Sequence, residues 1–522
     1  MKYLVIFSFL LLAPVRAAEP AGDGTVLSPA EIAQETAWLG SFGVNGTPVI
    51  EHPFSVPLSH RSFVIPVSWY RTIADQRPEL RRGEISADQL AADIPLLRMV
   101  MEKAYGGWEP AAKRGWNWSK WFDDWARQMA DKKGQFVPMR TALSPFADLM
   151  DFQLDNHSGP LVSSFGIGSG SRSAVLAAPP TAACTEMKTS LGKTYSMDAR
   201  DPGQQPRHAL LSDMSTAVWY LSYPNMRGEV AAVHCGDKWI EAKPAYQPQG
   251  ADRVRNVLGM ARTSEDEPSF RAVSEAISYL RLPTFSKQNG ERLRALIAGL
   301  PKSAGSEKLL IVDLRGNGGG DNPLDELRRW LDSATAKKAR NSNTRLGNSC
   351  LYAALRWGHT QLTMLGMQPP ISEILKQRLQ QEVDGLMQPS PEGCPVTFEE
   401  GKSDWNYRQH KLPATPRFLV LVDNGCGSDC EFMTYAFAAA PGTVIAGVNT
   451  YGVAQYIQPG NFLLPHSRLP FRIALGTSDL YGDGRSVDGY GLDVDVLLPG
   501  EADQSAERIT KLAELLTAQP KR

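Results

Sequence analysis

The clearest pattern along the chain is an alternation of apolar runs and amphipathic segments that begins near Phe270. Runs such as KLLIVDLRG and RFLVLVDN are almost continuously apolar, which is typical of strands buried on both faces. Segments such as NGERLRALIAGL and CEFMTYAFAAA lie between them and have the length and composition of helices. This alternation predicts an α/β core with a mainly parallel sheet over residues 270–500. Residues 345–413 interrupt it, and we interpret them as an insertion.

The chain before this core has a different pattern. Residues 19–160 are predicted to form an N-terminal, largely helical region, since apolar residues recur there at helical spacing, and we expect one of its helices over 137–154. Residues 161–269 are rich in Gly, Ser, Pro and Ala and contain short strand-like runs, which indicates a small β-rich intermediate region. Residues 501–522 are expected to form a C-terminal helix and tail.

The first 18 residues have the pattern of a secretory signal peptide. Lys2 precedes an apolar run over residues 3–12, and Val15 and Ala17 supply the small residues of a cleavage site. We therefore expect an exported protein, either periplasmic or secreted. No later apolar run approaches the roughly 20 residues that a membrane helix needs, so we expect no integral membrane segment after signal removal.

The charge composition limits the kinds of partner that we expect the protein to bind. Lys and Arg number 55 against 56 Asp and Glu, which leaves a net charge of −1. Without a basic excess there is little to attract a phosphate backbone, and we do not expect a nucleic-acid partner. We expect no metal and no organic cofactor. The sequence does not predict an oligomeric state.

The six cysteines favour disulfides, because an even number in an exported chain is typical of cross-linked proteins. Zinc is the alternative, but no CxxC pair occurs and no HxxxH follows. Six cysteines allow 15 connectivities, of which we favour the sequential one. Its pairs are Cys184 with Cys235, Cys350 with Cys394, and Cys426 with Cys430.

The first candidate for chemistry is Ser428 in the stretch NGCGSDCEFM. A buried strand ends just before it, a glycine-rich turn follows, and a helix begins around the serine. Free N–H groups and the helix dipole at such a place stabilise the oxyanion that forms when a serine attacks a carbonyl. The N–H of Asp429 is a natural donor to that oxyanion. The alternative is that Ser428 is only a helix cap, with Glu431 completing a capping box.

Two further windows bear on this choice. VDLRGNGGGDN ends a buried strand with three glycines, a turn in which backbone N–H groups can approach an anion. A phosphate loop would need Gly-Lys-Ser/Thr, which is missing, so Gly318 or Gly319 fits better as a second oxyanion donor, or else the glycines only form a tight turn. The third window, DLMDFQLDNHSGPL, places His157 in a polar turn after a helix, a different setting from those of the other seven histidines.

The order of these motifs resembles the C-terminal processing (tail-specific) protease family. LDxHSG, IVDLRGNGGG, LVDxxxxSxxE, NTYG and GYGLDVDV follow one another in the family order. The family core is similar to those of tricorn protease and interphotoreceptor retinoid-binding protein, and the resemblance implies a crotonase/ClpP-like α/β fold. It covers residues 270–499 and, more loosely, the helical region before them.

The resemblance implies roles for individual residues. Ser428 stands at the nucleophile position, three residues before Glu431. The tail-specific branch has its basic lysine where this chain has Val453, and no lysine occurs between Lys411 and Lys511. A Ser–Lys dyad of that kind is therefore not expected.

The tricorn-like branch instead uses a histidine, an adjacent serine and a late acid. Its pattern implies His157 as the base, Ser158 beside it, and Asp488 as the acid, with Asp483 and Asp493 as competitors. Ser158 follows the histidine here, whereas the serine precedes it in tricorn. The implied chemistry is Ser-His-acid acyl transfer.

The sequence thus predicts an exported serine peptidase that acts on polypeptides. A catalytically inactive relative that binds a peptide, an apolar ligand or a cell-wall component is the alternative, and the missing lysine is the reason to keep it. Residues 161–269 stand where the family usually has a PDZ module, but they contain no Gly-Leu-Gly-type carboxylate-binding loop. Recognition of a free C-terminus is therefore not predicted.

Overall fold

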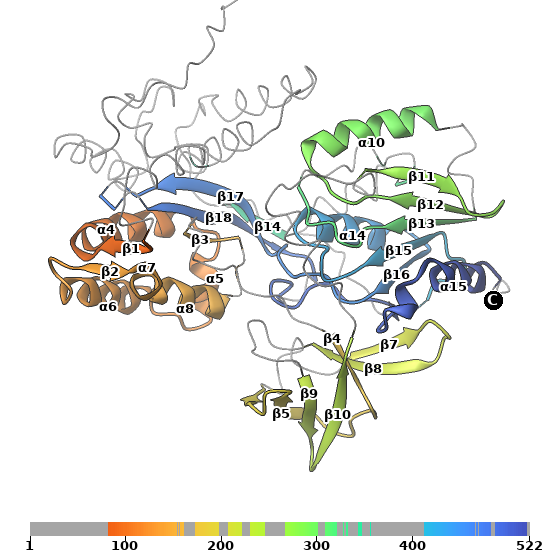
Figure 1. The fold of residues 1–522 in the computed structure, drawn as a ribbon, viewed down its shortest axis with the longest axis horizontal. Coiled ribbons are helices and arrows are strands. Elements are labelled where there is room, and N and C mark those ends of the chain that lie inside the picture. Colours follow the sequence, from red (N-terminus) through yellow and green to blue (C-terminus); the bar gives the residue numbers. More distant parts are fainter. Residues whose placement is uncertain are drawn as a thin grey trace, which may run out of the picture.

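The structure, a computed structural model, describes most of residues 82–518 (Figure 1). The expected signal peptide, the Cys350–Cys394 pair and most of the expected insertion lie outside the described residues. Within the described span the gaps are 154, 156, 161–172, 198–206, 222–229, 246–266, 301–307, 321–326, 328–329, 332–342, 347–411 apart from Leu355, 465, 468 and 482–485.

The N-terminal region is helical, as predicted. Ser86 caps its first helix by accepting a hydrogen bond from the N–H of Gln89 at 3.4 Å. The single helix expected over 137–154 is instead two, because the chain turns at Leu143 between them. A two-stranded ribbon closes the region. Its elements are β1 (Glu84–Ser86), α4 (Ala87–Ala104), α5 (Trp108–Lys113), α6 (Trp118–Ala130), β2 (Phe136–Pro138), α7 (Met139–Ala142) and α8 (Ser144–Gln153).

The intermediate region is built from antiparallel strands, which agrees with its β-rich prediction. The disulfide Cys184–Cys235 joins two neighbouring strands of this region, β5 and β9. The strand β7 (Arg207–Leu211) also pairs in parallel with β19 (Val496–Leu497) of the core, so one continuous sheet runs from the core into this region. The strands are β4 (Ser173–Leu176), β5 (Cys184–Thr189), β6 (Thr194–Ser196), β7 (Arg207–Leu211), β8 (Thr216–Leu221), β9 (Val230–Cys235) and β10 (Lys238–Pro244).

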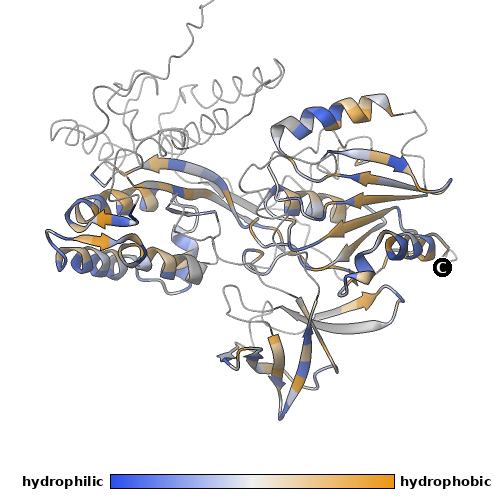
Figure 2. Cartoon of the chain, viewed as in Figure 1, coloured by the Kyte–Doolittle hydropathy of each residue, from blue (hydrophilic) through white to orange (hydrophobic). Residues whose placement is uncertain are grey.

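The core is a mainly parallel sheet, which confirms the predicted α/β class. Every residue of its three central strands is buried, and these strands are largely orange in Figure 2. Alternate residues of the strands face the two sides, so that Val420 packs in the cluster with α14 and Leu421 in the cluster with α15. In sheet order the strands are β11 (Ser269–Ala272), β12 (Ile277–Arg281), β13 (Leu309–Asp313), β15 (Phe418–Val422), β16 (Thr443–Gly447) and β19 (Val496–Leu497), and the helices are α10 (Lys287–Gly299), α14 (Asp429–Ala439), η4 (Ala502–Gln504) and α15 (Ala506–Ala518).

A long antiparallel hairpin connects the core to the N-terminal helices (Figure 1). It consists of β17 (Tyr456–Leu463) and β18 (Pro470–Asp479), and β14 (Asn343–Leu346) extends it at one end. Apolar residues of the hairpin share one buried cluster with the helices. The short strand β3 (Gly159–Pro160), directly after His157 and Ser158, also pairs with β18. The hairpin therefore holds the histidine-bearing turn against the rest of the molecule.

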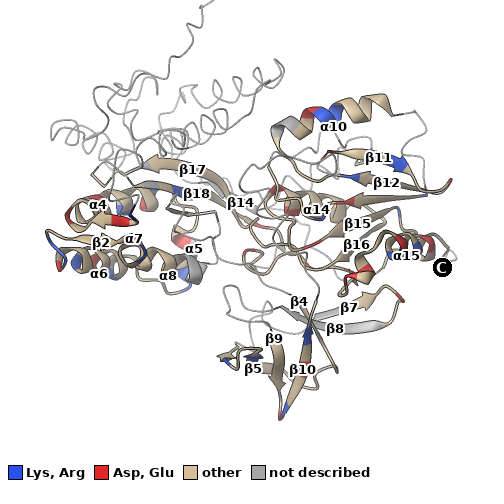
Figure 3. Cartoon of the chain, viewed as in Figure 1, with Lys and Arg blue, Asp and Glu red and all other residues tan. Residues whose placement is uncertain are grey.

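The surface charges agree with the balanced composition. Figure 3 shows acidic and basic residues close together on α6, α10 and α15. Among the described residues, no helix combines the length and the apolar character that crossing a bilayer requires.

Candidate active site

Ser428 lies at a sharp turn between β15 and α14. Its φ of 55° and ψ of −122° are values that a residue with a side chain rarely adopts. Such a conformation costs of order 1–3 kcal/mol and persists only where the surroundings hold it. Although Ser428 occupies the N-cap position of α14, its side chain makes no capping hydrogen bond. The capping-box alternative therefore does not describe this serine.

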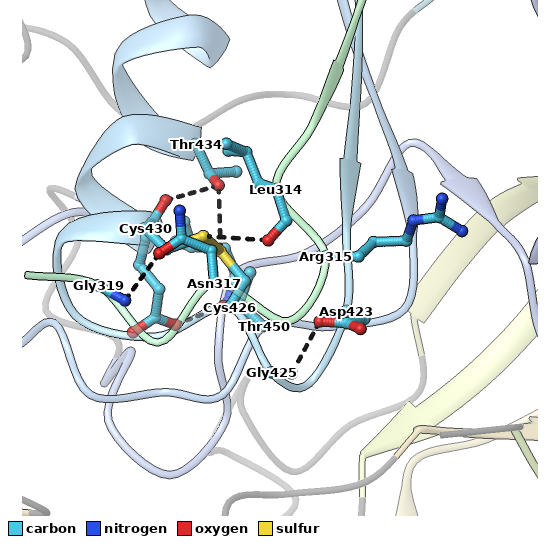
Figure 4. Close-up of a disulfide and its surroundings, with 12 residues drawn as sticks. Leu314, Arg315, Asn317, Gly319, Asp423, Gly425, Cys426, Cys430, Thr434 and Thr450 are labelled. Carbon is cyan, nitrogen blue, oxygen red and sulfur yellow. Dashed lines mark hydrogen bonds between the residues drawn. A yellow bond between two sulfur atoms is a disulfide. The ribbon is translucent and has the colours of Figure 1, made fainter. Parts of the chain in front are cut away.

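Several contacts hold the turn in this conformation (Figure 4). Asp423 Oδ1 accepts hydrogen bonds from the N–H groups of Gly316 and Gly425, each at 2.8 Å. Gly427 donates its N–H to the carbonyl of Asn317 at 3.1 Å. Burial raises the pKa of the Asp423 carboxyl, and these two N–H donors oppose that effect. The same carboxylate thus fixes the serine turn and the glycine-rich turn to each other.

The disulfide Cys426–Cys430 encloses Ser428 between its two cysteines. Both cysteines are fully buried. Cys430 Sγ also lies 3.6 Å from the carbonyl oxygen of Leu314, at the end of the neighbouring strand. The structure therefore contains two of the three sequential pairs that the sequence favours, and one of them braces the serine turn.

The glycine-rich turn touches the serine directly. Gly319 has a φ of 91°, and a Cβ at this position would lie 2.8 Å from Ser428 Cβ and 2.9 Å from the Asp429 nitrogen. No larger residue fits there, so the close approach explains this glycine. Its N–H donates to Asn317 Oδ1 at 2.9 Å and is not offered to a ligand in this structure. Gly318 is exposed, and a Cβ there would meet nothing within 4 Å.

Val453, at the position of the branch-specific lysine, also lies beside the turn. Its Cγ2 would be 3.0 Å from a Cβ placed on Gly427. The valine is buried, at 9% exposure. The described residues therefore have an apolar methyl group at this place and no amine that could serve as a base.

His157 is held by its own turn. Asp155 Oδ1 accepts from the N–H groups of His157 at 2.8 Å and Ser158 at 3.0 Å, which is an Asx-type turn. The other oxygen of Asp155 accepts from the hydroxyl of Tyr105 at 2.9 Å. Sequence reasoning missed Asp155, although an aspartate two residues before a histidine in a polar turn is the signal that could have found it.

The His157 imidazole is neutral at physiological pH. Burial lowers its pKa to about 4, the charge of Arg472 adds to this effect, and a hydrogen bond to the backbone of Tyr456 opposes it. Its Nδ1 atom is buried and has no hydrogen-bond partner in the described part of the chain. The ring is thus in the protonation state that a general base requires.

The two other members of the expected constellation lie nearby but bond elsewhere. Ser158 Oγ accepts from the N–H of Ala474 on β18 at 2.8 Å. Asp488 is fully buried, and its carboxylate accepts from the N–H groups of Gln455 at 2.6 Å and Tyr456 at 3.4 Å. Burial raises its pKa well above the ordinary value. His157 and Asp488 thus contact the backbone of the same residue, Tyr456.

These side chains do not form a closed triad in this structure. Among the described residues, Ser428 Oγ, the His157 imidazole and the Asp488 carboxylate make no hydrogen bond to one another. Of the two competing acids, Asp493 is buried and Asp483 lies outside the described residues. The structure places Ser428, the glycine-rich turn and the Asp488 segment in the core. It holds the turn of His157 against the hairpin through the pairing of β3 with β18.

Comparison with known proteins identifies the core. Residues 276–497 match the model of peptidase family S41. No curated protein matches the chain. Three solved structures that resemble it are mature CPAF (13% identity, TM-score 0.38, 83% of this chain and 96% of the other), the photosystem II D1 C-terminal processing protease (13%, 0.34, 83% and 98%) and tricorn protease (12%, 0.31, 82% and 37%).

The structural likeness is distant. The matched segment, residues 276–497, contains the glycine-rich turn, the serine turn with Ser428, and Asp488. The family match agrees with the resemblance that the order of the motifs indicates. Over residues 276–497 the chain therefore carries a domain of peptidase family S41, and it is a serine-type peptidase by this domain.

Proposed function

We propose that the protein cleaves polypeptides by acyl-enzyme chemistry with Ser428 as the nucleophile. The observation that carries this proposal is the conformation of Ser428, which has a strained backbone at a strand-to-helix turn and a hydroxyl that caps nothing. A helix cap gains nothing from such strain, whereas a nucleophile gains an exposed oxygen beside backbone N–H groups.

In the proposed reaction, Ser428 Oγ adds to the carbonyl carbon of the scissile peptide while His157 takes the hydroxyl proton. The C–N bond then breaks, and His157 returns the proton to the departing amine. A water molecule, with His157 again acting as base, attacks the acyl ester and releases a carboxylic acid and Ser428. The N–H groups of Asp429 and Gly318 are the proposed oxyanion donors, since the N–H of Gly319 already bonds Asn317.

His157 is proposed as the base because it is neutral and its Nδ1 atom is without a partner in the described structure. It must approach Ser428 when substrate binds, as catalytic hydrogen bonds are often long in unliganded enzymes. Asp488 is proposed to act on the histidine indirectly. It holds the N–H of Tyr456, whose backbone also bonds the imidazole.

We also propose that the protein is exported. The signal-peptide pattern of residues 1–18 predicts it, and the disulfides Cys184–Cys235 and Cys426–Cys430 support it because such bonds persist in oxidising compartments. A polypeptide is the proposed substrate on the basis of the family match.

The test is labelling of the purified protein with a fluorophosphonate probe, which reacts only with an activated serine. We expect label on the wild type and none on Ser428→Ala. Ser505→Ala is the matched control, because Ser505 also precedes a helix but caps it, accepting from the N–H of Arg508 at 3.3 Å. Label should persist on Ser505→Ala.

A folded wild type that takes no label would refute the peptidase proposal. It would favour the second candidate, a relative that binds a peptide, an apolar ligand or a cell-wall component without cleaving it. The specific observation behind that candidate is Val453, whose methyl group lies beside the serine turn where one branch of the family has its basic lysine.

A further inference from the structure

Glu431 lies one helical turn after Ser428, and its side chain is fully buried. Its Oε1 accepts from the Thr450 hydroxyl and, at 2.8 Å, from the N–H of Gly452. Its Oε2 accepts from the N–H of Val453 at 2.7 Å. One carboxylate on the serine-bearing helix thus fixes three of the four residues 450–453, which we call the clamp loop.

The clamp loop is in turn packed between the serine turn and the segment that carries the acid. On one side, Tyr451 donates its N–H to the carbonyl of Cys426 at 2.8 Å. On the other side, Leu492 donates its N–H to Thr450 Oγ1 at 2.6 Å, and Gly489 donates its N–H to the carbonyl of Gly452 at 2.8 Å. The loop therefore transmits the position of α14 to residues 487–492.

The packing around Gly452 leaves no room for a side chain. Its φ is 85°, and a Cβ there would lie 2.7 Å from the Gly491 nitrogen and 2.7 Å from the Val487 carbonyl oxygen. Residues 487–492 include Asp488, which holds the N–H groups of Gln455 and Tyr456. A continuous set of contacts thus runs from the helix of Ser428 to the residue whose backbone bonds His157.

From this geometry we infer that Glu431 is the positioning residue that keeps the clamp loop and the Asp488 segment in register with Ser428. The inference rests on the proposed function, because it assigns a role within the same site. Glu431 touches neither the substrate nor the reacting atoms in this role. It acts through the loop.

The positioning role requires the ionised carboxylate. Both oxygens face N–H or O–H donors, so a proton on either one would displace a hydrogen bond. Burial raises the pKa of Glu431 to about 7, and the bonds from Thr450, Val453 and Gly452 oppose the rise. The carboxylate form becomes populated as the pH rises through about 7, and activity should rise with it.

Other ionisable groups also lie on the packed elements, and the test must separate them from Glu431. Asp488 lies on the acid segment, and burial raises its pKa well above the ordinary value, with the charges of Asp155 and Glu431 adding to the rise. A change at Thr450, whose hydroxyl bonds Glu431, therefore separates the two carboxyls. Asp429 lies on α14, and Tyr451 and Tyr490 lie on the loop and the acid segment. His157, with a pKa of about 4, is already neutral.

The experiment measures the rate of fluorophosphonate labelling of the full chain between pH 5 and 9. In the wild type we expect the rate to rise with a midpoint near pH 7. Glu431→Gln should be labelled at least tenfold more slowly at pH 8, with the loss in the maximal labelling rate and not in the half-saturating probe concentration, and the midpoint near 7 should disappear. Equal rates and an equal midpoint in the two proteins would overturn the inference.

Two further variants keep the test decisive if Glu431→Gln shows no cooperative thermal unfolding. Thr450→Val removes a hydrogen bond that lowers the pKa of Glu431, so the midpoint should move to higher pH, and Thr450→Ser should restore it. A midpoint that is the same in Thr450→Val as in the wild type would also overturn the inference.

The matched control is Asp93→Asn. Asp93 is also a buried carboxylate that accepts from two backbone N–H groups, those of His466 at 3.0 Å and Ser467 at 2.7 Å, but on the hairpin turn. Its variant should lose stability and keep the wild-type midpoint. A wild type that takes no label at any pH would instead refute the proposed function, and this inference with it.

Discussion

A Cβ on Gly319 would lie 2.8 Å from the Cβ of Ser428, although the two residues are more than a hundred positions apart in the chain. Real carbon atoms do not approach so closely, so the glycine is required by its neighbour and not by its own turn alone. The serine turn and the glycine-rich turn can therefore be perturbed through a single methyl group.

Gly319→Ala should destabilise the fold by about 1–3 kcal/mol, because it adds an overpacked methyl group and a strained positive φ. It should also abolish labelling of Ser428 by a fluorophosphonate. Thermal unfolding and labelling measure the two effects. Gly290→Ala on α10 is the control, since a Cβ there meets nothing within 4 Å, and it should raise stability by up to about 1 kcal/mol. Normal labelling of Gly319→Ala would contradict the close approach.

Ser428→Gly should stabilise the fold while it removes the nucleophile. Glycine adopts a φ of 55° without the steric cost that serine bears, so the free energy of unfolding should rise by about 1 kcal/mol. Chemical denaturation measures this change. Ser505→Ala should do the opposite, because it removes a real cap and lowers stability by about 1 kcal/mol. A loss of stability in Ser428→Gly would show that the turn is not strained.

The lowered pKa of His157 predicts that the fold loses stability in acid. Its folded pKa of about 4 lies below the ordinary 6.5, so the unfolded chain takes up the proton first as the pH falls. The contribution of the neutral ring is complete above pH 6.5 and is lost progressively as the pH falls from 6.5 to 4, by up to about 3 kcal/mol. His157→Gln should flatten this part of the stability–pH curve and slow labelling by roughly 10²–10⁴-fold. Full labelling of His157→Gln would refute its assignment as the base.

We expect loss of the Cys426–Cys430 disulfide to slow the reaction of Ser428 as well as to lower the stability of the fold. Replacing both cysteines with serine should lower stability by about 2 kcal/mol and slow labelling, because the bond braces the turn that presents Ser428. Cys184→Ser with Cys235→Ser removes the other described disulfide, which lies in the β-rich region, and should cost stability without changing the labelling rate. Equal labelling in the wild type and the Cys426/Cys430 double variant would mean that the brace is dispensable.

Much of the core could be predicted from the sequence because the information there is local. The apolar runs of β13 and β15 predict buried strands, and the glycines that follow them predict sharp turns, so the setting of Ser428 is visible in about a dozen residues. The prediction of one continuous helix over 137–154 was wrong, because nothing in the apolar pattern indicates the turn at Leu143.

The relation between His157 and Asp488 could not be predicted in the same way. Both carboxylate oxygens of Asp488 are used by the N–H groups of Gln455 and Tyr456, which are contacts between loops distant in sequence. The spacing of Glu431 from Ser428 indicated a capping box. In the structure its carboxylate instead accepts hydrogen bonds from the three donors of the clamp loop. In each case tertiary hydrogen bonds decide what the side chain does.

The pairing of β3 with β18 makes the proposed active centre depend on contact between distant parts of the chain. Gly159 and Pro160 connect the histidine turn to the hairpin by pairing with Arg472 and Phe471, and Ser158 adds its hydrogen bond from Ala474. The serine stands roughly 270 residues further along the chain than the histidine, so synthesis must pass both before they can meet. A nascent chain, or one cut between them before folding, would carry a well-formed nucleophile with no base beside it. The proposed active centre could therefore form only after the chain has been made past β18 and the turn of His157 has paired with it.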